Sequence, residues 1–205
     1  MKPDTQQYFA SRPESQSDAK PFLLHWQSND YSFYTDHGVF SKGELDRGTK
    51  ILLQALPQEF SGRMLDLGCG WGAIGLLMKA CNPDAHITLC DVNERAVSLS
   101  RRNAKNNRLE AEVILSDGME NVAGLFDLIA FNPPIRAGKD TVYRLFREAA
   151  KQLASDGSVY IVIRKQQGAQ SAYTYLLTLF QSVQTVSKES GYKVFECKGC
   201  LDDTV

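Results

Sequence analysis

The sequence predicts an α/β fold in which a doubly wound, mostly parallel sheet of seven strands carries helices on both faces. Two observations support this prediction. From residue 63 onward, short apolar runs alternate with amphipathic helical segments, and only short turns separate them. In addition, a chain of 205 residues with 43% hydrophobic content is long enough for one compact α/β domain and short for a second.

The segment before this alternation is expected to contain an arm, a hairpin and a helix. Residues 1–28 begin with a polar stretch rich in Ser, Gln and Pro, which predicts a partly flexible N-terminal arm. Alternating aromatic residues and turn residues over 31–40 predict a small hairpin. Ser41 and the glutamate three residues later fit a capping box, so we expect a helix from Ser41 to about Leu56. Gly48 inside this helix indicates that another group approaches closely.

Residues 29–198 are expected to form the folded domain, and residues 199–205 a tail. The predicted strands of the sheet are 64–67, 86–90, 112–115, 126–131 and 159–163, followed by two runs around Val183 and Val194. The predicted helices cover 74–78 and its flanks, 93–105, 141–153 and 169–180. Cys197 and Cys200 form a single C-x-x-C pair without the further ligands that a zinc site needs, and we expect them in a frayed tail.

The composition argues against several classes of protein. Lys and Arg total 23 against 24 Asp and Glu, which argues against nucleic-acid binding through bulk positive charge but allows a local basic rim. The chain has no run of eighteen apolar residues, so no membrane span is expected, and its start lacks the apolar core of a signal peptide. Five cysteines at irregular spacing do not resemble a secreted disulfide framework. We therefore expect a cytoplasmic protein.

Gly68, Gly70 and Gly72 lie between the first strand of this sheet and the helix that follows. Glycines at such a junction permit a tight turn and let a ligand approach bare backbone. Taken alone, the pattern also fits a loose dinucleotide fingerprint that ends at Ala73, which leaves a nicotinamide-dependent oxidoreductase open. A tight turn that binds no ligand is the third interpretation.

Three carboxylates at strand ends favour a different ligand. Asp66 lies two residues before Gly68, where it could neutralise an ammonium group and would repel a pyrophosphate. Asp91 ends the next strand, about twenty residues past the glycines, where a carboxylate can accept hydrogen bonds from both hydroxyls of a ribose. Asp117 follows the third strand and suits the amino group of a purine. Together the three fit a ligand with a ribose, an adenine and a cationic amino acid, such as S-adenosyl-L-methionine.

The motifs MLDLGCGWGAIGL, DVNERA, SDG and FNPPI resemble the successive motifs of class I S-adenosylmethionine-dependent methyltransferases, which have a Rossmann-like fold. More narrowly, TDHGVFSKGELDRGT, FNPPIRAGK and VIRKQQGA resemble the small-subunit ribosomal RNA methyltransferase C family, which acts on guanine N2. The likeness covers about residues 30–195. It implies S-adenosyl-L-methionine as cofactor and ribosomal RNA or the small ribosomal subunit as partner, and we expect a monomer. The cofactor-binding residues it implies are Asp66, Gly68, Gly70, Gly72, Asp91, Asn93 on the ribose side, Asp117, Asn132, and Thr49 with Gly48 at the methionine end.

Asn132, Pro133 and Pro134 follow a predicted strand and are expected to carry the catalysis. Two consecutive prolines give a rigid, extended loop without backbone donors, which leaves carbonyl groups pointing inward. The Asn132 side-chain oxygen and the Pro133 carbonyl could then accept hydrogen bonds from one exocyclic NH2 and expose the nitrogen lone pair. Holding the nucleophile in line with the methyl group supplies most of the catalysis, so no strong general base is required. A purely structural Pro-Pro turn is the alternative.

Ile135 bears on the choice of substrate. In adenine-N6 and protein-glutamine methyltransferases with this loop, the corresponding position is usually aromatic and stacks on the target. Ile135 therefore favours guanine N2, with adenine N6 or a glutamine amide as the alternative. Phe40 or Phe131 is then a candidate for stacking on the base, although a core position is the better expectation for Phe131.

Four basic residues follow strand ends on the predicted active face: Arg136, Lys139, Arg164 and Lys165. We expect them to bind phosphates of an RNA whose target base is flipped out or single-stranded. Ordinary solvated charge is the alternative interpretation. A non-catalytic RNA-binding module with a vestigial cofactor pocket also stays open as an interpretation of the whole chain.

Overall fold

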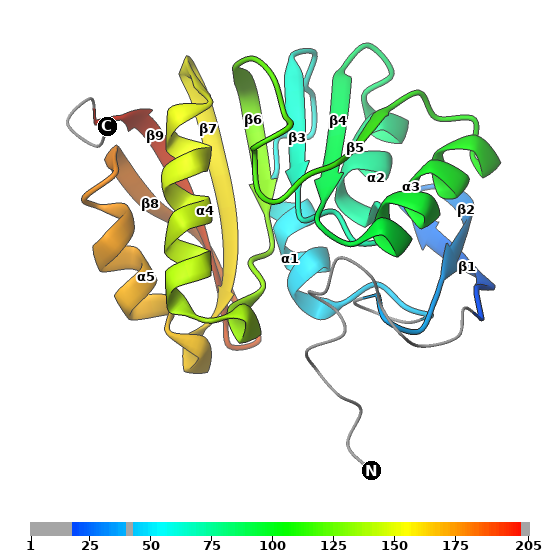
Figure 1. The fold of residues 1–205 in the computed structure, drawn as a ribbon, viewed down its shortest axis with the longest axis horizontal. Helices are drawn as coiled ribbons and strands as arrows, with labels where there is room; N and C mark the ends of the chain where they lie inside the picture. Colours follow the sequence, from blue (N-terminus) through cyan, green and yellow to red (C-terminus); the bar gives the residue numbers. More distant parts are fainter. Residues whose placement is uncertain (1–17, 40–42, 202–205) are drawn as a thin grey trace.

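The computed structural model describes residues 18–39 and 43–201. The described chain opens with an antiparallel hairpin made of β1 (Lys20–Trp26) and β2 (Asn29–Thr35). Figure 1 shows this hairpin at one end of the molecule, next to α3. Strand β8, at the edge of the seven-stranded sheet, lies at the other end. The hairpin forms a separate two-stranded sheet.

The hairpin corrects the prediction for residues 31–40. Its partner strand precedes β2, and the chain turns at Gln27, whose φ of 53° is left-handed. Part of the segment 1–28 that was expected to be an arm is therefore strand. This strand is held by its aromatic residues, since the ring of Phe22 packs edge-on against Trp71 at 5.4 Å between centroids. The strand pattern of β1 is hard to recognise in the sequence, because polar residues precede it.

The main sheet confirms the predicted α/β fold. Its strands are β3 (Arg63–Leu67), β4 (His86–Asp91), β5 (Glu112–Leu115), β6 (Phe126–Phe131), β7 (Leu153–Arg164), β8 (Phe180–Glu189) and β9 (Tyr192–Cys200). They are arranged in the order β5-β4-β3-β6-β7-β9-β8. Only β9 runs antiparallel to its neighbours, so the sheet is mostly parallel, as predicted.

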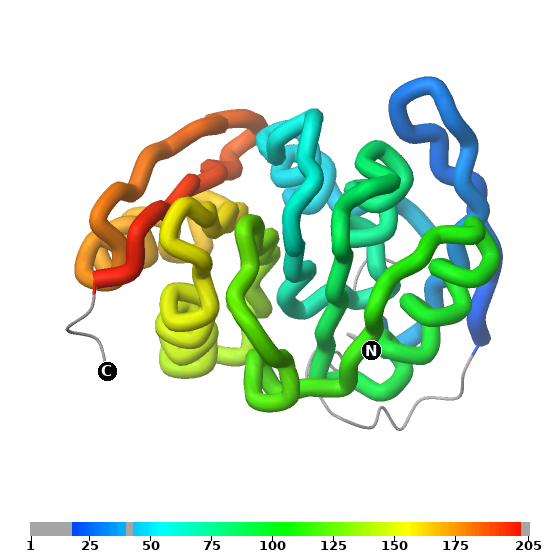
Figure 2. Tube along the Cα trace, turned by 90° about the horizontal axis from the view of Figure 1, so that it is seen from above, coloured from blue at the N-terminus to red at the C-terminus, as the bar shows by residue number. Residues whose placement is uncertain are grey.

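Helices cover both faces of this sheet. They are α1 (Arg47–Ala55), α2 (Ala73–Cys81), α3 (Glu94–Asn106), α4 (Lys139–Lys151) and α5 (Ala169–Leu176), with short 3-10 turns η2 (Ile135–Ala137) and η3 (Lys165–Gln167). Successive strand residues point to opposite faces. Met64 accordingly packs in a core with α1, α2, α3 and the hairpin, whereas Leu65 packs in a second core with α4 and α5. Figure 2 shows the hairpin and α1 (blue and cyan) on one side of the sheet and α4 (yellow) on the other.

Helix α1 begins later than the sequence predicts. Asp46, and not Ser41, is its N-cap, because the Asp46 carboxylate accepts a hydrogen bond from the backbone N–H of Thr49 at 3.0 Å. Ser41 lies outside the described residues. Gly48 consequently belongs to the first turn of the helix, not to its interior. A Cβ at Gly48 would lie 3.0 Å from the Tyr192 ring, which explains the close approach that the glycine indicates.

The C-terminal end also differs from the prediction. Strand β9 continues through Gly199 to Cys200, so the expected tail of 199–205 begins too early and the C-x-x-C pair is not frayed. Cys197 is fully buried in the core beneath α5, and burial raises the pKa of its thiol. Both cysteines are therefore sheet residues. Within the described ranges, none of the helices has the length and apolar content that crossing a membrane requires.

Candidate active site

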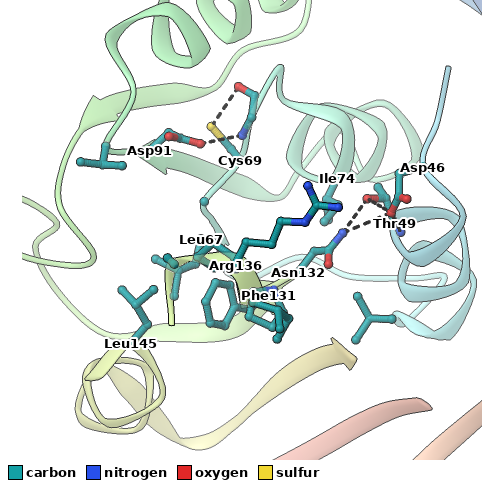
Figure 3. A pocket seen from close by; sticks show the side chains of 18 of the residues that line it. Asp46, Thr49, Leu67, Cys69, Ile74, Asp91, Phe131, Asn132, Arg136 and Leu145 are labelled. Atoms are coloured by element: carbon teal, nitrogen blue, oxygen red, sulfur yellow. Dashed lines mark hydrogen bonds between the residues drawn. The ribbon is translucent and has the colours of Figure 1, made fainter. Parts of the chain in front are cut away.

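A cavity of about 700 Å³ opens where the carboxyl ends of the parallel strands meet (Figure 3). The chain leaves β3 toward β4 on one side, and β6 pairs with β3 on the other. Such a switch point is where doubly wound sheets bind ligands. We call the part lined by Gly68, Gly70, Asp91 and Asp117 the cofactor half. The part lined by Asp46, Thr49, Asn132, Ile135, Arg136, Arg164 and Tyr192 is the substrate half.

The glycine loop after β3 is shaped by hydrogen bonds to the next strand. The backbone N–H groups of Gly68 and Cys69 both donate to the Cys90 carbonyl at 2.9 Å, and the N–H of Gly70 donates to the Asp91 carboxylate at 2.8 Å. Gly68 and Gly70 have φ values of 69° and 58° and line the cavity, as predicted for a cofactor loop. Gly72 does not line it: its φ of 90° makes the turn into α2, and a Cβ there would lie 2.9 Å from Leu76, so it serves the turn and the packing.

Asp66 is fully buried beneath the glycine loop and does not itself line the cavity. Its Oδ2 accepts a hydrogen bond from the Gly75 N–H at 2.8 Å, and its Oδ1 has no partner among the described residues. The pKa of Asp66 is raised to about 7, chiefly by burial and to a lesser extent by the nearby Asp91 carboxylate, while the Gly75 hydrogen bond acts in the opposite direction. A buried, half-satisfied carboxylate of this kind favours a cationic ligand and disfavours a pyrophosphate.

Asp91 is held from two sides at the end of β4. Its Oδ2 accepts from Gly70, and its Oδ1 accepts from the Asn93 N–H at 2.9 Å. Burial raises the pKa of Asp91 in spite of these backbone hydrogen bonds. Each oxygen keeps acceptor capacity. Both can therefore receive ribose hydroxyls from the cavity.

Asn93 does not line the cavity. Its side chain caps α3 by accepting from the Arg95 N–H at 2.9 Å, and its amide donates to the Gly38 carbonyl at 2.9 Å. The predicted ribose-side support by Asn93 is therefore indirect, through α3 and the loop that follows the hairpin. The sequence signal for this role is the N-cap preference for Asn.

Asp117 lines the cavity after β5, and the structure adds a partner that the sequence did not reveal. Arg144 on α4 donates to Asp117 at 2.6 Å and to Glu148 at 2.6 Å. Glu148 in turn accepts from the Met119 N–H at 3.0 Å, so α4 holds the loop after β5 in place. The one sequence signal is that Arg144 and Glu148 are one helical turn apart.

Asn132 lies at the end of β6 in the substrate half. Its amide nitrogen is 3.0 Å from the Thr49 hydroxyl and 3.4 Å from the Asp46 carboxylate, as the dashed lines in Figure 3 show. Thr49 lines the cavity, and its hydroxyl contacts Asp46 and Asn132. Asp46 is a site residue that the sequence analysis missed. Aspartate is a preferred N-cap residue, and its position just before an apolar helical segment is the signal that could have found it.

Both proline carbonyls of the loop after β6 already accept a backbone hydrogen bond. Pro133 and Pro134 line the cavity, but the Pro133 carbonyl accepts a hydrogen bond from the Ile135 N–H at 2.8 Å. It therefore has one lone pair left for a target amine. The Pro134 carbonyl likewise accepts from the Ala137 N–H at 2.8 Å. Asn132 is consequently the better placed acceptor of this loop.

The predicted substrate residues separate into two groups. Ile135, Arg136 and Arg164 line the cavity, and both arginines are exposed at its mouth. Lys139 and Lys165 do not line it, and the ammonium of Lys139 lies over the Tyr143 ring at 4.9 Å.

The aromatic residues considered for stacking on the target base do not all lie in the cavity. Phe40 lies outside the described residues. Phe131 contacts the cavity but is fully buried against Phe146, as its core interpretation predicts. Tyr192, which the sequence analysis did not single out, also lines the cavity, and the Arg164 guanidinium lies 6.0 Å from its ring centroid. Over the described ranges, no group of three His, Cys, Asp or Glu is arranged to hold a metal ion.

The order of the seven strands, the glycine loop after β3 and the acidic ends of β4 and β5 define a class I methyltransferase that uses S-adenosylmethionine. Comparison with known families agrees: the chain belongs to the methyltransferase small domain family, whose model matches residues 30–196.

Several known proteins are similar over most of the chain. The uncharacterized protein YbxB of Bacillus subtilis is 39% identical over 198 residues, which cover 95% of this chain and 98% of YbxB. Ribosomal RNA small subunit methyltransferase C of Pasteurella multocida is 41% identical over 180 residues, which cover 85% of this chain and 54% of that protein. The chain therefore spans about half the length of the methyltransferase C relatives it matches.

Solved structures agree with the fold. The T. thermophilus 16S rRNA N2 methyltransferase RsmC, in complex with S-adenosylmethionine and guanosine, has a TM-score of 0.80 at 26% identity, covering 88% of this chain and 50% of that one. A methyltransferase from Pyrococcus furiosus has a TM-score of 0.64 at 24% identity, covering 73% of this chain and 81% of that one, and it shows the shared fold alone.

Proposed function

We propose that this methyltransferase transfers a methyl group to the exocyclic N2 of guanine in ribosomal RNA. The observation that carries the proposal is that the cofactor half and the substrate half belong to one continuous cavity. Gly68 and Asp91 lie on one wall, and Asn132 lies on the other with its side-chain amide already oriented by α1. This arrangement suits a donor on the first wall and an amine on the second.

When bound, S-adenosylmethionine would supply an electrophilic methyl group: its transfer to guanine N2 would leave the S–C bonding electrons on sulfur and release one N2 proton to water. The chain's own residues bind and orient. Asp91 is suited to ribose hydroxyls, Asp117 to the adenine amino group, and the buried charge of Asp66 to the cationic end. Asn132 Oδ1 is suited to accept a hydrogen bond from the target NH2 and hold its nitrogen toward the methyl group.

Two observations favour guanine N2 over adenine N6 or a glutamine amide. Ile135 is aliphatic where the latter two groups carry an aromatic ring, and it lines the substrate half. The relatives named ribosomal RNA small subunit methyltransferase C and the guanosine-containing RsmC structure point to the same base.

RNA as the substrate is supported by charge at the cavity mouth. Arg136 and Arg164 both line the mouth and are exposed there, although the chain as a whole has a net charge of −1. Local cations of this kind bind phosphates next to an extruded base. As part of this proposal, we expect the enzyme to act in the cytoplasm and to be a monomer.

The test is identification of the product. The purified chain is incubated with deuterated-methyl S-adenosylmethionine and either naked 16S rRNA or small ribosomal subunits. The RNA is then digested to nucleosides and analysed by mass spectrometry. The proposal predicts label in N2-methylguanosine. Label in N6-methyladenosine or in protein would assign one of the alternative amines, and cofactor binding without any transfer would favour a non-catalytic RNA-binding module.

A further inference from the structure

A chain of hydrogen bonds connects the first turn of α1 to the side chain of Asn132. The Thr49 hydroxyl lies 3.4 Å from the Asp46 Oδ2, and the Asn132 amide nitrogen lies 3.0 Å from the same hydroxyl. In the sequence, Asn132 is 83 positions from Thr49 and 86 positions from Asp46. These contacts form a direct physical connection between a helix cap and the proposed catalytic amide.

The direction of these hydrogen bonds is set by Asp46. An ionised carboxylate only accepts hydrogen bonds, so the Thr49 hydroxyl donates its single proton to Asp46. The hydroxyl oxygen is then an acceptor toward Asn132, and only the NH2 end of the Asn132 amide can occupy that position. The carbonyl oxygen of the same amide is left on the other side. Among the described residues it has no hydrogen-bond partner.

The first turn of α1 is held firmly enough to act in this way. The Asp46 carboxylate also caps the helix through the Thr49 N–H at 3.0 Å, and Thr49 is 6% exposed. Gly48 packs so tightly that a Cβ there would lie 3.0 Å from the Tyr192 ring and 3.1 Å from the Asp46 carboxylate. A negative charge at a helix N-terminus is itself favourable.

We infer that Asp46 and Thr49 are positioning residues that fix the amide of Asn132, so that its Oδ1 is presented to the exocyclic amine of the substrate. This inference rests on the proposed function for what Asn132 accepts. The orientation itself rests on the Asp46–Thr49–Asn132 contacts alone. It gives Thr49 a role different from the one that the sequence predicts, which is a contact to the methionine end of the cofactor.

The two roles of Thr49 have different consequences. Loss of a cofactor contact raises the dissociation constant for S-adenosylmethionine. Loss of the orienting hydroxyl leaves that constant unchanged and lowers kcat, because the amide then keeps only the 3.4 Å contact with Asp46 and turns its NH2 toward the substrate amine more readily. Misplacement of a group by about 1 Å lowers rates by up to about 100-fold.

The experiment compares Thr49→Val, which keeps the shape and removes the hydroxyl, with Thr49→Ser, which restores it. Thr174→Val, an exposed threonine on α5, is the matched control. The readouts are kcat and KM for RNA methylation, the dissociation constant for S-adenosylmethionine, and the side-chain amide resonances of Asn132 in ¹⁵N-labelled protein. Those resonances are assigned by their loss in Asn132→Asp.

We expect Thr49→Val to lower kcat by about 10- to 100-fold with cofactor affinity unchanged, and to speed solvent exchange of the Asn132 amide protons. Thr49→Ser restores most of both. Asp46→Asn keeps a helix cap but can donate to Thr49, so it gives two Asn132 amide environments. A Thr49→Val protein with weaker cofactor binding and unchanged kcat, or with unchanged amide exchange, would overturn the inference. If the wild type transfers no methyl group, the proposed function fails, and the amide resonances still decide the orientation.

Discussion

In the cofactor half of the cavity, backbone groups do most of the shaping, whereas in the substrate half side chains do. Gly70, in the loop after β3, and Asp91, at the end of β4, hydrogen-bond across 21 positions. Asn132 is fixed by Thr49 across 83 positions, through side-chain atoms at both ends. We therefore expect cofactor binding to depend on the strand–loop–helix unit, and acceptance of the proposed target amine to depend on how α1 docks against the end of β6.

The largest expected effect is on the cofactor half. Asp91→Ala removes two charge-assisted acceptors for the ribose and the partner of the Gly70 N–H. We expect S-adenosylmethionine affinity to fall at least about 100-fold, because each such hydrogen bond contributes about 1.5–3 kcal/mol. Isothermal titration calorimetry measures it, with the exposed Asp84→Ala as control. Unaltered affinity in Asp91→Ala would remove Asp91 from the site.

A tenfold effect is expected from pH. With the pKa of Asp66 at about 7, roughly a tenth of the carboxylate is ionised at pH 6 and nine tenths at pH 8, so affinity for the cationic cofactor rises about tenfold between them. In Asp66→Asn, affinity is independent of pH over this range. A wild-type affinity that is flat from pH 6 to pH 8 would contradict this role.

The same carboxyl group affects stability in the opposite direction. Its folded pKa of about 7 lies above the ordinary value of 3.8, so the folded state binds the proton more tightly than the unfolded state. Without cofactor, the contribution of Asp66 to the free energy of unfolding therefore falls as pH rises from about 4 to about 7, and then levels off. Urea titrations of wild type and Asp66→Asn at several pH values measure this slope difference. If the free energy of unfolding of the wild type falls no more steeply between pH 4 and pH 7 than that of Asp66→Asn, the carboxyl group of Asp66 is not held protonated by burial.

A smaller effect is expected at the mouth of the substrate half. Arg136→Ala and Arg164→Ala each remove one phosphate contact, so each raises KM for RNA several-fold and reduces the slope of log affinity against log salt by about 0.7–0.9. Affinity for S-adenosylmethionine stays the same. Lys105→Ala, in the last turn of α3, is the control. Slopes unchanged in both arginine variants would assign those side chains to ordinary solvated charge.

The smallest effect concerns the support of Asp117. Arg144→Met removes the hydrogen bonds that tie Asp117 and Glu148 together. Because Asp117 itself is retained, we expect cofactor affinity to weaken by only about 2- to 5-fold, in the range of a single exposed ion pair. Arg147→Met, one turn away with Tyr175 as its partner, is the matched control. Equal effects in the two variants would show that α4 does not position Asp117.

The difference between the two halves also explains what the sequence could predict. Strands β5 and β6 match their predicted ranges of 112–115 and 126–131, because buried parallel strands appear as short apolar runs bounded by turn residues. The glycine loop and Asp91 are likewise local signals. Asp117 was identified by its strand end, but its partner Arg144 lies on a helix that reaches it only in the folded chain.

Prediction failed where long-range packing decides the local structure. The pairing of β1 with β2 depends on Phe22 meeting Trp71, which no local pattern reveals. The start of α1 at Asp46 was obscured by an equally good capping pattern at Ser41. A capping signal could mark Asp46 as a helix start, but its contact with Asn132 and the place of Tyr192 in the substrate half follow from the docking of α1 and were not visible in the sequence.

If the two halves work separately, Asn132 acts on the substrate amine only after the cofactor is bound. Asn132→Ala then impairs the second step alone, and the exposed Asn29→Ala is the control. Single-turnover methyl transfer and the dissociation constant for S-adenosylmethionine are measured on the same preparations. We predict that Asn132→Ala slows transfer at least about 100-fold while cofactor affinity stays at the wild-type value. Wild-type transfer by this variant, or loss of cofactor binding in step with loss of transfer, would contradict the account.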